Sequence, residues 1–243
     1  EGQALLGGLG VALMCLWIDW PHWTIALIFA AGAAAVFGAA WAAIPAWLQS
    51  KRGSHIVITT IMFNFIGFSL LNYVLVNNLR PTGSMDPASA KFVSSAHLPT
   101  FHEMLAPFGI AFSKHSPANV TFLIALLAAV LVWILIWHTR LGYQIRGYGH
   151  SESAAKYAGI SPHKIIMISM LISGGLAGMM AINNVMGEAE RLVLNATEGA
   201  GFIGIAVALM GRSHPVGVVI AAVLFGFLYQ GGAELSLWQN IPR

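Results

Sequence analysis

Charged side chains are scarce in this sequence. Asp, Glu, Lys and Arg make up 9% of its 243 residues, whereas a soluble domain of ordinary composition carries about 25%. The single cysteine, Cys15, lies in an apolar stretch, which excludes a disulfide framework and a thiolate metal site. A formal net charge of +3 is too small to indicate nucleic-acid binding. The residues are 57% hydrophobic and the mean hydropathy is +0.74, which predicts an all-α integral membrane protein.

Motifs that carry catalysis or bind metals are also missing. None of the nine histidines forms a His-x3-His pair within a predicted helix, so we expect no metal site. The sequence contains no Gly-x4-Gly-Lys-Ser/Thr phosphate loop and no Gly-x-Ser-x-Gly nucleophile elbow. We therefore expect no cofactor, no catalytic residue and no hydrolysis of ATP by the chain itself.

Long apolar runs divide the chain into membrane segments. The stretch 199–211 holds about 13 residues, or roughly 20 Å of helix, so we expect it to be tilted, extended by neighbouring residues or re-entrant. The chain is expected to form one transmembrane domain over residues 1–243, with six to seven membrane segments, as a fragment of a longer protein. The other predicted segments cover residues 4–20, 24–48, 56–77, 118–138, 164–186 and 216–231.

The distribution of Lys and Arg predicts the orientation of these segments. Cytoplasmic loops are enriched in both residues, which assigns 49–55 and 139–164 to the cytoplasm. Alternation then places the polar loop 79–117 on the extracytoplasmic side. The basic residues on which this assignment rests are Lys51, Arg52, Arg140, Arg146, Lys156 and Lys164.

The cytoplasmic loop 139–163 is predicted to contain a short helix of its own. Ser151 is a suitable N-cap, Glu152 lies in the first turn, and Gly159 is placed to end the helix. Ser161-Pro162 then begins the next helix, with proline at its first position. A loop that only connected two membrane helices would not need a capped helix, so we expect this helix to contact a partner.

Polar residues inside two apolar segments are the candidates for a solute path. Thr60 and Asn64 lie one turn apart on one helix face, and Asn183 and Asn184 lie near the end of segment 164–186. Amides at such depth need hydrogen-bond partners. They either bond between helices or line a polar pathway, and the sequence leaves both interpretations open.

Small residues predict close contacts between helices. Segment 24–48 carries a stripe of Gly32, Ala35, Gly38 and Ala39, and segment 164–186 carries a Gly174-x3-Gly178 pair. One interpretation is that these residues serve tight packing alone. The other is functional: the glycine-rich region 187–211 places irregular backbone beside a cavity, as in transporters.

Four stretches resemble one family of membrane proteins. The run RLGYQIRGYGHSESAAKYAGI, which ends at Ile160, resembles the cytoplasmic loop of permease subunits in bacterial ABC importers of the ribose and branched-chain amino acid type. Three further runs resemble the nucleoside and simple-sugar branch: EGQ at Glu1 to Gln3, KRGSHIVITTIMFNF at Lys51 to Phe65, and GFIGIAVALMGRSHPVGVVIAAVLFGFLYQGG at Gly201 to Gly232. EGQ stands where ribose members carry a DLS-VG run, which favours nucleosides over free pentoses.

The resemblance implies a polytopic helical ABC permease bundle in the bacterial inner membrane. It implies several partners: a second permease subunit (identical or related), a cytoplasmic ATP-binding subunit, an extracytoplasmic solute-binding protein and the lipid bilayer. The helix at 151–158 would then contact the ATPase. The residues expected at that contact are Glu152, Ala154, Ala155, Lys156, Ala158 and Gly159.

Two other classes of membrane protein are alternatives to an ABC permease. An ATP-independent secondary transporter or channel would need an ionisable coupling residue deep in a helix. None of the nine acidic residues is expected there, Asp19 lying at a segment end. A membrane enzyme would need clustered histidines or carboxylates on one side of the bilayer, and the sequence lacks such a cluster.

Overall fold

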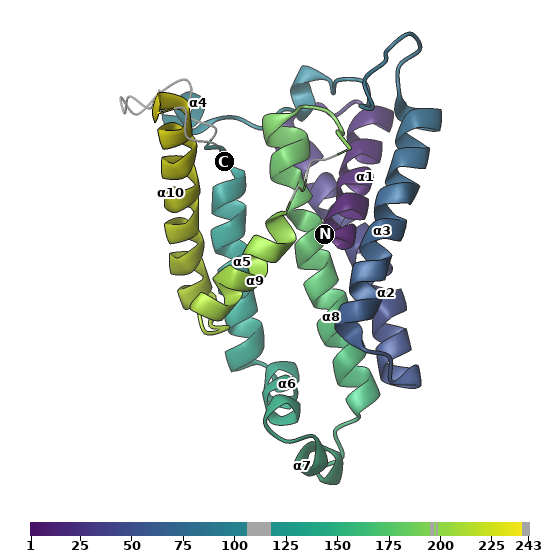
Figure 1. Cartoon of the computed structure of the whole chain (residues 1–243), viewed down its shortest axis with the longest axis vertical. Coiled ribbons are helices and arrows are strands. Elements are labelled where there is room, and N and C mark those ends of the chain that lie inside the picture. Colours follow the sequence, from purple (N-terminus) through teal and green to yellow (C-terminus); the bar gives the residue numbers. More distant parts are fainter. Residues whose placement is uncertain (106–117, 195–196, 198, 240–243) are drawn as a thin grey trace.

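A computed structural model describes residues 1–105, 118–194, 197 and 199–239 of the chain (Figure 1). Within these ranges almost all regular structure is helical. The elements are α1 (Gly2–Trp17), α2 (Trp23–Arg52), α3 (Ile56–Val74), η1 (Leu75–Leu79), η2 (Ser94–Ala96), α4 (Phe101–Leu105), α5 (Thr121–His138), α6 (Arg140–His150), α7 (Glu152–Tyr157), α8 (Pro162–Met179), η4 (Asn183–Glu188), α9 (Ala200–Met210) and α10 (Pro215–Gln239).

Helix α1 lies at the centre of the larger packed group. Every residue from Ala4 to Ala12 is buried, as expected for a helix that is apolar on all sides. It packs against α2, α3 and α8 (Figure 1). The buried cluster extends from this helix to Leu71, Leu75, Ile182 and Met186 on its neighbours.

Glycines bring α2 and α8 into close contact. A Cβ at Gly174 would meet the carbonyl oxygen of Gly38 at 2.8 Å, and a Cβ at Gly178 would lie 3.1 Å from the Cα of Gly38. The predicted small-residue contact is confirmed for these residues. Gly32 does not share it, because a Cβ there would meet nothing within 4 Å. Gly32 and Gly38 are six residues apart, which places them on different faces of the helix.

Helices α5, α9 and α10 form a second group beside the first (Figure 1). Helix α5 has no buried residue. Helix α9 begins in the middle of the bundle and runs obliquely to its turn with α10 (Figure 1). Its 11 residues rise only about 16 Å, so it does not cross the bundle alone.

The described residues contain five helical spans that are long and apolar enough to cross a membrane. They are Trp23–Arg52, Ile56–Leu79, Thr121–His138, Pro162–Glu188 and Pro215–Gly232. Each coincides with a predicted segment, and the shorter apolar helices α1 and α9 account for the remaining two. The prediction of an all-α polytopic membrane protein is confirmed.

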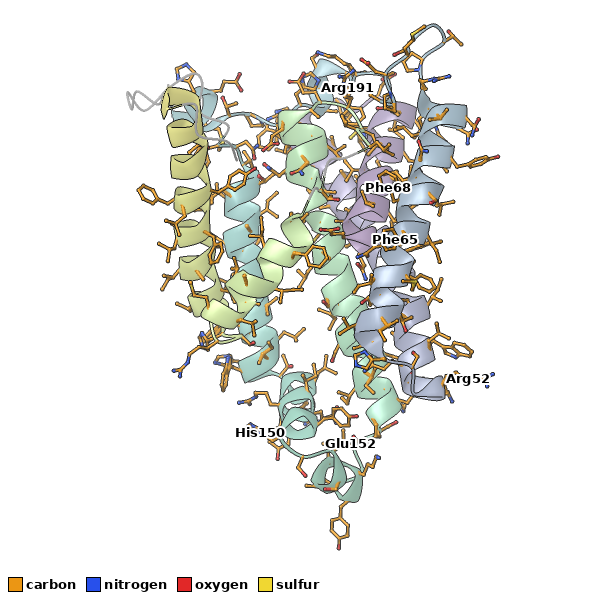
Figure 2. The ribbon with its side chains drawn as sticks, in the orientation of Figure 1. Arg52, Phe65, Phe68, His150, Glu152 and Arg191 are labelled. Atoms are coloured by element: carbon orange, nitrogen blue, oxygen red, sulfur yellow. The ribbon has the colours of Figure 1, made fainter. Side chains whose placement is uncertain are left out.

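The two ends of the bundle carry different loops. Arg52, His150 and Glu152 lie at one end, and Arg191 lies at the other (Figure 2). The two loops assigned to the cytoplasm are thus at the same end. At the opposite end the described part of loop 79–117 bonds to the segment after η4, since Ser89 N donates to Leu192 O at 2.9 Å. Residues 106–117 of that loop lie outside the described residues.

Candidate functional site

Helix α7 projects at one end of the bundle, and local chemistry fixes both its ends. Ser151 Oγ accepts a hydrogen bond from Ala154 N at 3.3 Å, so Ser151 is the predicted N-cap. At the other end Ile160 N donates to Ala155 O at 2.9 Å and Gly159 N donates to Lys156 O at 3.0 Å. These two bonds form a Schellman motif, which Gly159 permits with φ of +80°. The predicted capped helix is confirmed.

An ion pair spans the exposed side of α7. Lys156 Nζ lies 2.7 Å from Glu152 Oε1, four residues earlier, and both side chains are exposed. The hydrogen bond from Lys156 to Glu152, together with the charge of that carboxylate, raises the pKa of Lys156. This side of the helix therefore presents a fixed pair of opposite charges.

The surface that α7 offers to a partner differs from the predicted one. Ala154 and Ala158 are exposed as expected, but Ala155 is only 4% exposed. Successive helical residues are about 100° apart, so a helix that packs on its own chain turns one side of its surface inward. Ala155 is that residue, and its side chain positions the helix. Tyr157, which the sequence did not single out, is 98% exposed.

Helix α6 was not predicted, because its glycines and charges were interpreted as a loop. Thr139 caps it by accepting a hydrogen bond from Gly142 N at 3.0 Å, and α7 follows after Ser151 alone. A polar cavity of about 560 Å³ lies between these helices and the α2–α3 turn. Its lining includes Ser54, Glu152, Lys156 and His163. The two predicted cytoplasmic loops are therefore neighbours.

Asn183 belongs to a hydrogen-bonded cluster at the opposite end of the bundle. Its Oδ1 accepts from Asn119 Nδ2 at 3.0 Å and from Thr121 Oγ1 at 2.9 Å. Its Nδ2 donates to Glu188 Oε1 at 3.1 Å and to Asn184 Oδ1 at 3.4 Å. The sequence left open whether this amide bonds between helices or lines a polar pathway. These hydrogen bonds favour the first interpretation, because they join η4 to the residues at the start of α5.

This cluster lies at the wall of a mostly apolar cavity between α5 and α8. The cavity holds about 730 Å³, and Asn119, Thr121 and Asn183 line it. The remaining lining is apolar: Phe101, Ala118, Phe122, Ile124, Ala125, Ala128, Leu176, Met179, Met180 and Ile182. A cavity whose polar lining is already bonded within itself is poorly suited to a solute rich in hydroxyl groups.

Thr60 and Asn64 have different environments although they share a helix. Thr60 Oγ1 bonds back to the carbonyls of Ile56 and Val57 at 2.9 and 3.0 Å, so its hydroxyl is used within α3. Asn64 Oδ1 accepts from Gly2 N on α1 at 2.8 Å. The Asn64 side chain also lines a third cavity, of about 440 Å³, where α1, α3 and α9 meet.

This third cavity, called the α1–α3–α9 cavity below, combines aromatic rings with a few polar groups. Phe65 and Phe68 come from α3, and both lie at mid-height of the bundle (Figure 2). Glu1 adds a carboxyl group beside Asn64. The full lining is Glu1, Leu5, Ile61, Asn64, Phe65, Phe68, Leu194, Thr197 and Phe202. Apolar walls with a few convergent polar groups, at this volume, are typical of small-molecule sites.

Glu1, the N-cap of α1, brings an acidic side chain inside the bundle although it does not lie deep in a helix. The N-terminal end of α1 lies midway between the two ends of the bundle (Figure 1), and Glu1 Oε1 is buried there. The sequence places Glu1 and Phe202 two hundred residues apart, so their meeting in one cavity depends on the tertiary fold.

These features define an α-helical membrane transport protein. The family described as branched-chain amino acid transport system, permease component, matches residues 1–241, and the chain belongs to this family. A multi-pass location in the bacterial inner membrane, as predicted, is confirmed by this membership and by the helical spans.

Three curated relatives match nearly the whole chain. It is 37% identical to a guanosine ABC transporter permease protein of Bacillus subtilis, over 100% of the chain and 67% of the relative. It is 31% identical to a glucose ABC transporter permease protein of Haloferax volcanii, over 100% and 63%, and 31% identical to a nucleoside ABC transporter permease protein of Lactococcus lactis, over 97% and 64%. The chain thus spans about two thirds of these relatives' length. No solved structure matches it.

These names confirm the predicted family branch and the interpretation as a transport subunit rather than an enzyme. They also decide against an ATP-independent transporter. Within the described residues no group of three or more His, Cys, Asp or Glu side chains is placed to hold a metal ion.

Proposed function

We propose that this chain is the permease subunit of an ATP-driven importer and forms the translocation path for nucleosides or related simple sugars. Its similarity to guanosine, nucleoside and glucose permeases supports this solute class. These solutes are neutral and share vicinal hydroxyl groups. A permease for them needs hydrogen-bonding groups inside the bundle, and a nucleoside also needs surfaces on which its base can stack.

The α1–α3–α9 cavity is the part of the chain that meets both needs. Phe65, Phe68 and Phe202 offer aromatic faces, and Glu1 and Asn64 offer polar atoms within reach of them. Of the four path candidates in the sequence, Asn64 is therefore proposed to contact the solute. Thr60 and Asn183 are proposed to stabilise the helices, because their hydrogen bonds are made within the protein.

The partners follow from the family and from α7. The importer would contain a second permease subunit, cytoplasmic ATP-binding subunits and an extracytoplasmic solute-binding protein, with loop 139–163 on the cytoplasmic side and loop 79–117 on the opposite side. The observation that carries the ATPase contact is α7 itself, a capped helix that projects with Tyr157 98% exposed. Because it is joined to α5 through α6 and to α8 through the turn 158–161, a push on α7 moves both helices as rigid bodies.

Site-directed cross-linking tests this contact in the assembled complex. The only cysteine of this chain, Cys15, is buried, so Tyr157→Cys adds an accessible thiol at the tip of α7. A short thiol-to-amine reagent is expected to join this variant to the ATPase subunit. Met85→Cys is the matched control, because Met85 is 96% exposed and lies in the loop after η1. Equal ATPase cross-linking from both positions, or from neither, would contradict the assignment.

A further inference from the structure

The carboxyl group of Glu1 has an unmet hydrogen-bonding requirement. Its Oε1 is buried and accepts no hydrogen bond from any described residue. Burying a polar atom without a partner costs free energy, so native structures pair such atoms or use them for function. Glu1 is among the residues that line the α1–α3–α9 cavity, so a rotation of its carboxyl group brings an acceptor oxygen to the donors of a solute bound there.

The start of α9 holds Glu1 in place. A Cβ at Gly201 would lie 2.6 Å from Glu1 Cγ and 3.3 Å from Glu1 Oε1. Only a glycine leaves room for the carboxyl group at this contact. The N-terminal turn of a helix also favours a negative group beside it, and α9 begins at Ala200. The start of α9 therefore limits the space that is open to the Glu1 side chain.

The neighbouring groups define what kind of solute fits. Asn64 Oδ1 is occupied by Gly2 N, so the group that Asn64 has left to offer is its Nδ2 donor. Glu1 supplies acceptors and Asn64 supplies a donor, which matches hydroxyl groups that both donate and accept. Phe65 and Phe202, 65% and 62% exposed, add faces on which a flat ring can stack.

We propose that Glu1 determines specificity for the sugar part of a nucleoside, by accepting hydrogen bonds from its vicinal hydroxyl pair while the phenylalanines hold the base. This inference rests on the proposed transport function and adds a named contact to it. Glu1 positions the solute and takes no part in ATP hydrolysis.

Uptake of two solutes by the full-length importer tests the contact. Guanosine carries the vicinal hydroxyl pair, and 2′,3′-dideoxyguanosine lacks it. In proteoliposomes, Glu1→Gln is expected to raise the KM for guanosine about tenfold, the loss of one hydrogen bond to a carboxyl group. The same substitution is expected to leave the KM for the dideoxy analogue unchanged, since that solute makes no such bond. Gln3→Ala, on the same helix and outside the cavity lining, is the control and is expected to change neither KM.

A second variant keeps the carboxyl group but displaces it. Gly201→Ala is expected to weaken guanosine uptake selectively, because the added methyl group occupies the space of Glu1 Cγ. Gly204→Ala is its control, as a Cβ there meets nothing within 4 Å. An equal rise in the KM for guanosine and for its dideoxy analogue would overturn the hydroxyl contact. Unchanged guanosine kinetics in both Glu1→Gln and Gly201→Ala would overturn the role of Glu1. The proposed function fails by a different result, the absence of ATP-dependent guanosine uptake by the unaltered protein.

Discussion

Gly178 is a position where packing in this bundle is sensitive to one added methyl group. It lies where α1, α2 and α8 meet, since a Cβ at Gly7 of α1 would also strike its backbone. A Cβ at Gly178 would meet the carbonyl oxygen of Ala34 well inside van der Waals contact, and it would lie 3.1 Å from the Cα of Gly38. Both obstacles are backbone atoms. No change of side-chain rotamer relieves them, so α2 and α8 must move apart.

The magnitude follows from two opposing terms. Overpacking a closely packed contact costs about 1–3 kcal/mol, whereas replacing glycine by alanine inside a helix gains up to about 1 kcal/mol. The second term is shared by Gly32→Ala on α2, where the new methyl group meets nothing within 4 Å. The difference between Gly178→Ala and Gly32→Ala therefore isolates the packing term, about 1–3 kcal/mol of unfolding free energy.

Thermal unfolding of the full-length permease in detergent, followed by circular dichroism, measures this difference. At about 2–4 °C per kcal/mol for a chain of this size, Gly178→Ala is expected to melt several degrees below Gly32→Ala. Equal melting temperatures for the two variants would refute the close α2–α8 contact on which the bundle is built.

Three further substitutions probe the site. Asn183→Leu is expected to lower the unfolding free energy by about 1–3 kcal/mol, because it removes the hydrogen bonds of Asn183 to Asn119, Thr121 and Glu188. A melting temperature no lower than that of Asn77→Leu, an exposed amide bonded within its own chain segment, would argue against the cluster. Asn64→Leu is expected to lower solute uptake without lowering the amount of assembled complex, and unchanged uptake kinetics would return Asn64 to a purely structural role. Ser151→Ala removes an N-cap worth about 1 kcal/mol and is expected to reduce the amount of solute transported per ATP hydrolysed. Ser161→Ala is the control and is expected to leave this ratio unchanged, because the Ser161 side chain makes no cap hydrogen bond. Identical ratios in these two serine variants would disprove a coupling role for a rigid α7.

Local chemistry made the membrane segments and the ends of α7 predictable. Segment boundaries such as 24–48, observed as Trp23–Arg52, follow from hydropathy because a bilayer sets the length of a span. The cap at Ser151 and the stop at Gly159 depend only on residues within one turn, so sequence alone was sufficient for both.

Contacts between distant residues were not predictable in the same way. Asn183 meets Asn119 across 64 positions, and Glu1 meets Asn64 and Phe202 only because α1, α3 and α9 converge. The side of α7 that faces inward is also a tertiary property, which is why Ala155 was placed on the wrong surface. Resemblance had drawn attention to Glu1 as part of the EGQ run, but only the cavity suggests what its carboxyl group does.

The central claim is that this chain carries nucleosides or related sugars through the membrane at the expense of ATP hydrolysed by a partner. The most direct measurement is uptake of labelled guanosine by proteoliposomes that contain the full-length permease, its ATPase and its solute-binding protein, with ATP supplied on the side of α7. The account predicts accumulation above the external concentration that requires hydrolysable ATP. Equilibration of guanosine across the membrane without ATP would contradict this account. So would the absence of ATP-dependent uptake of both guanosine and a simple sugar.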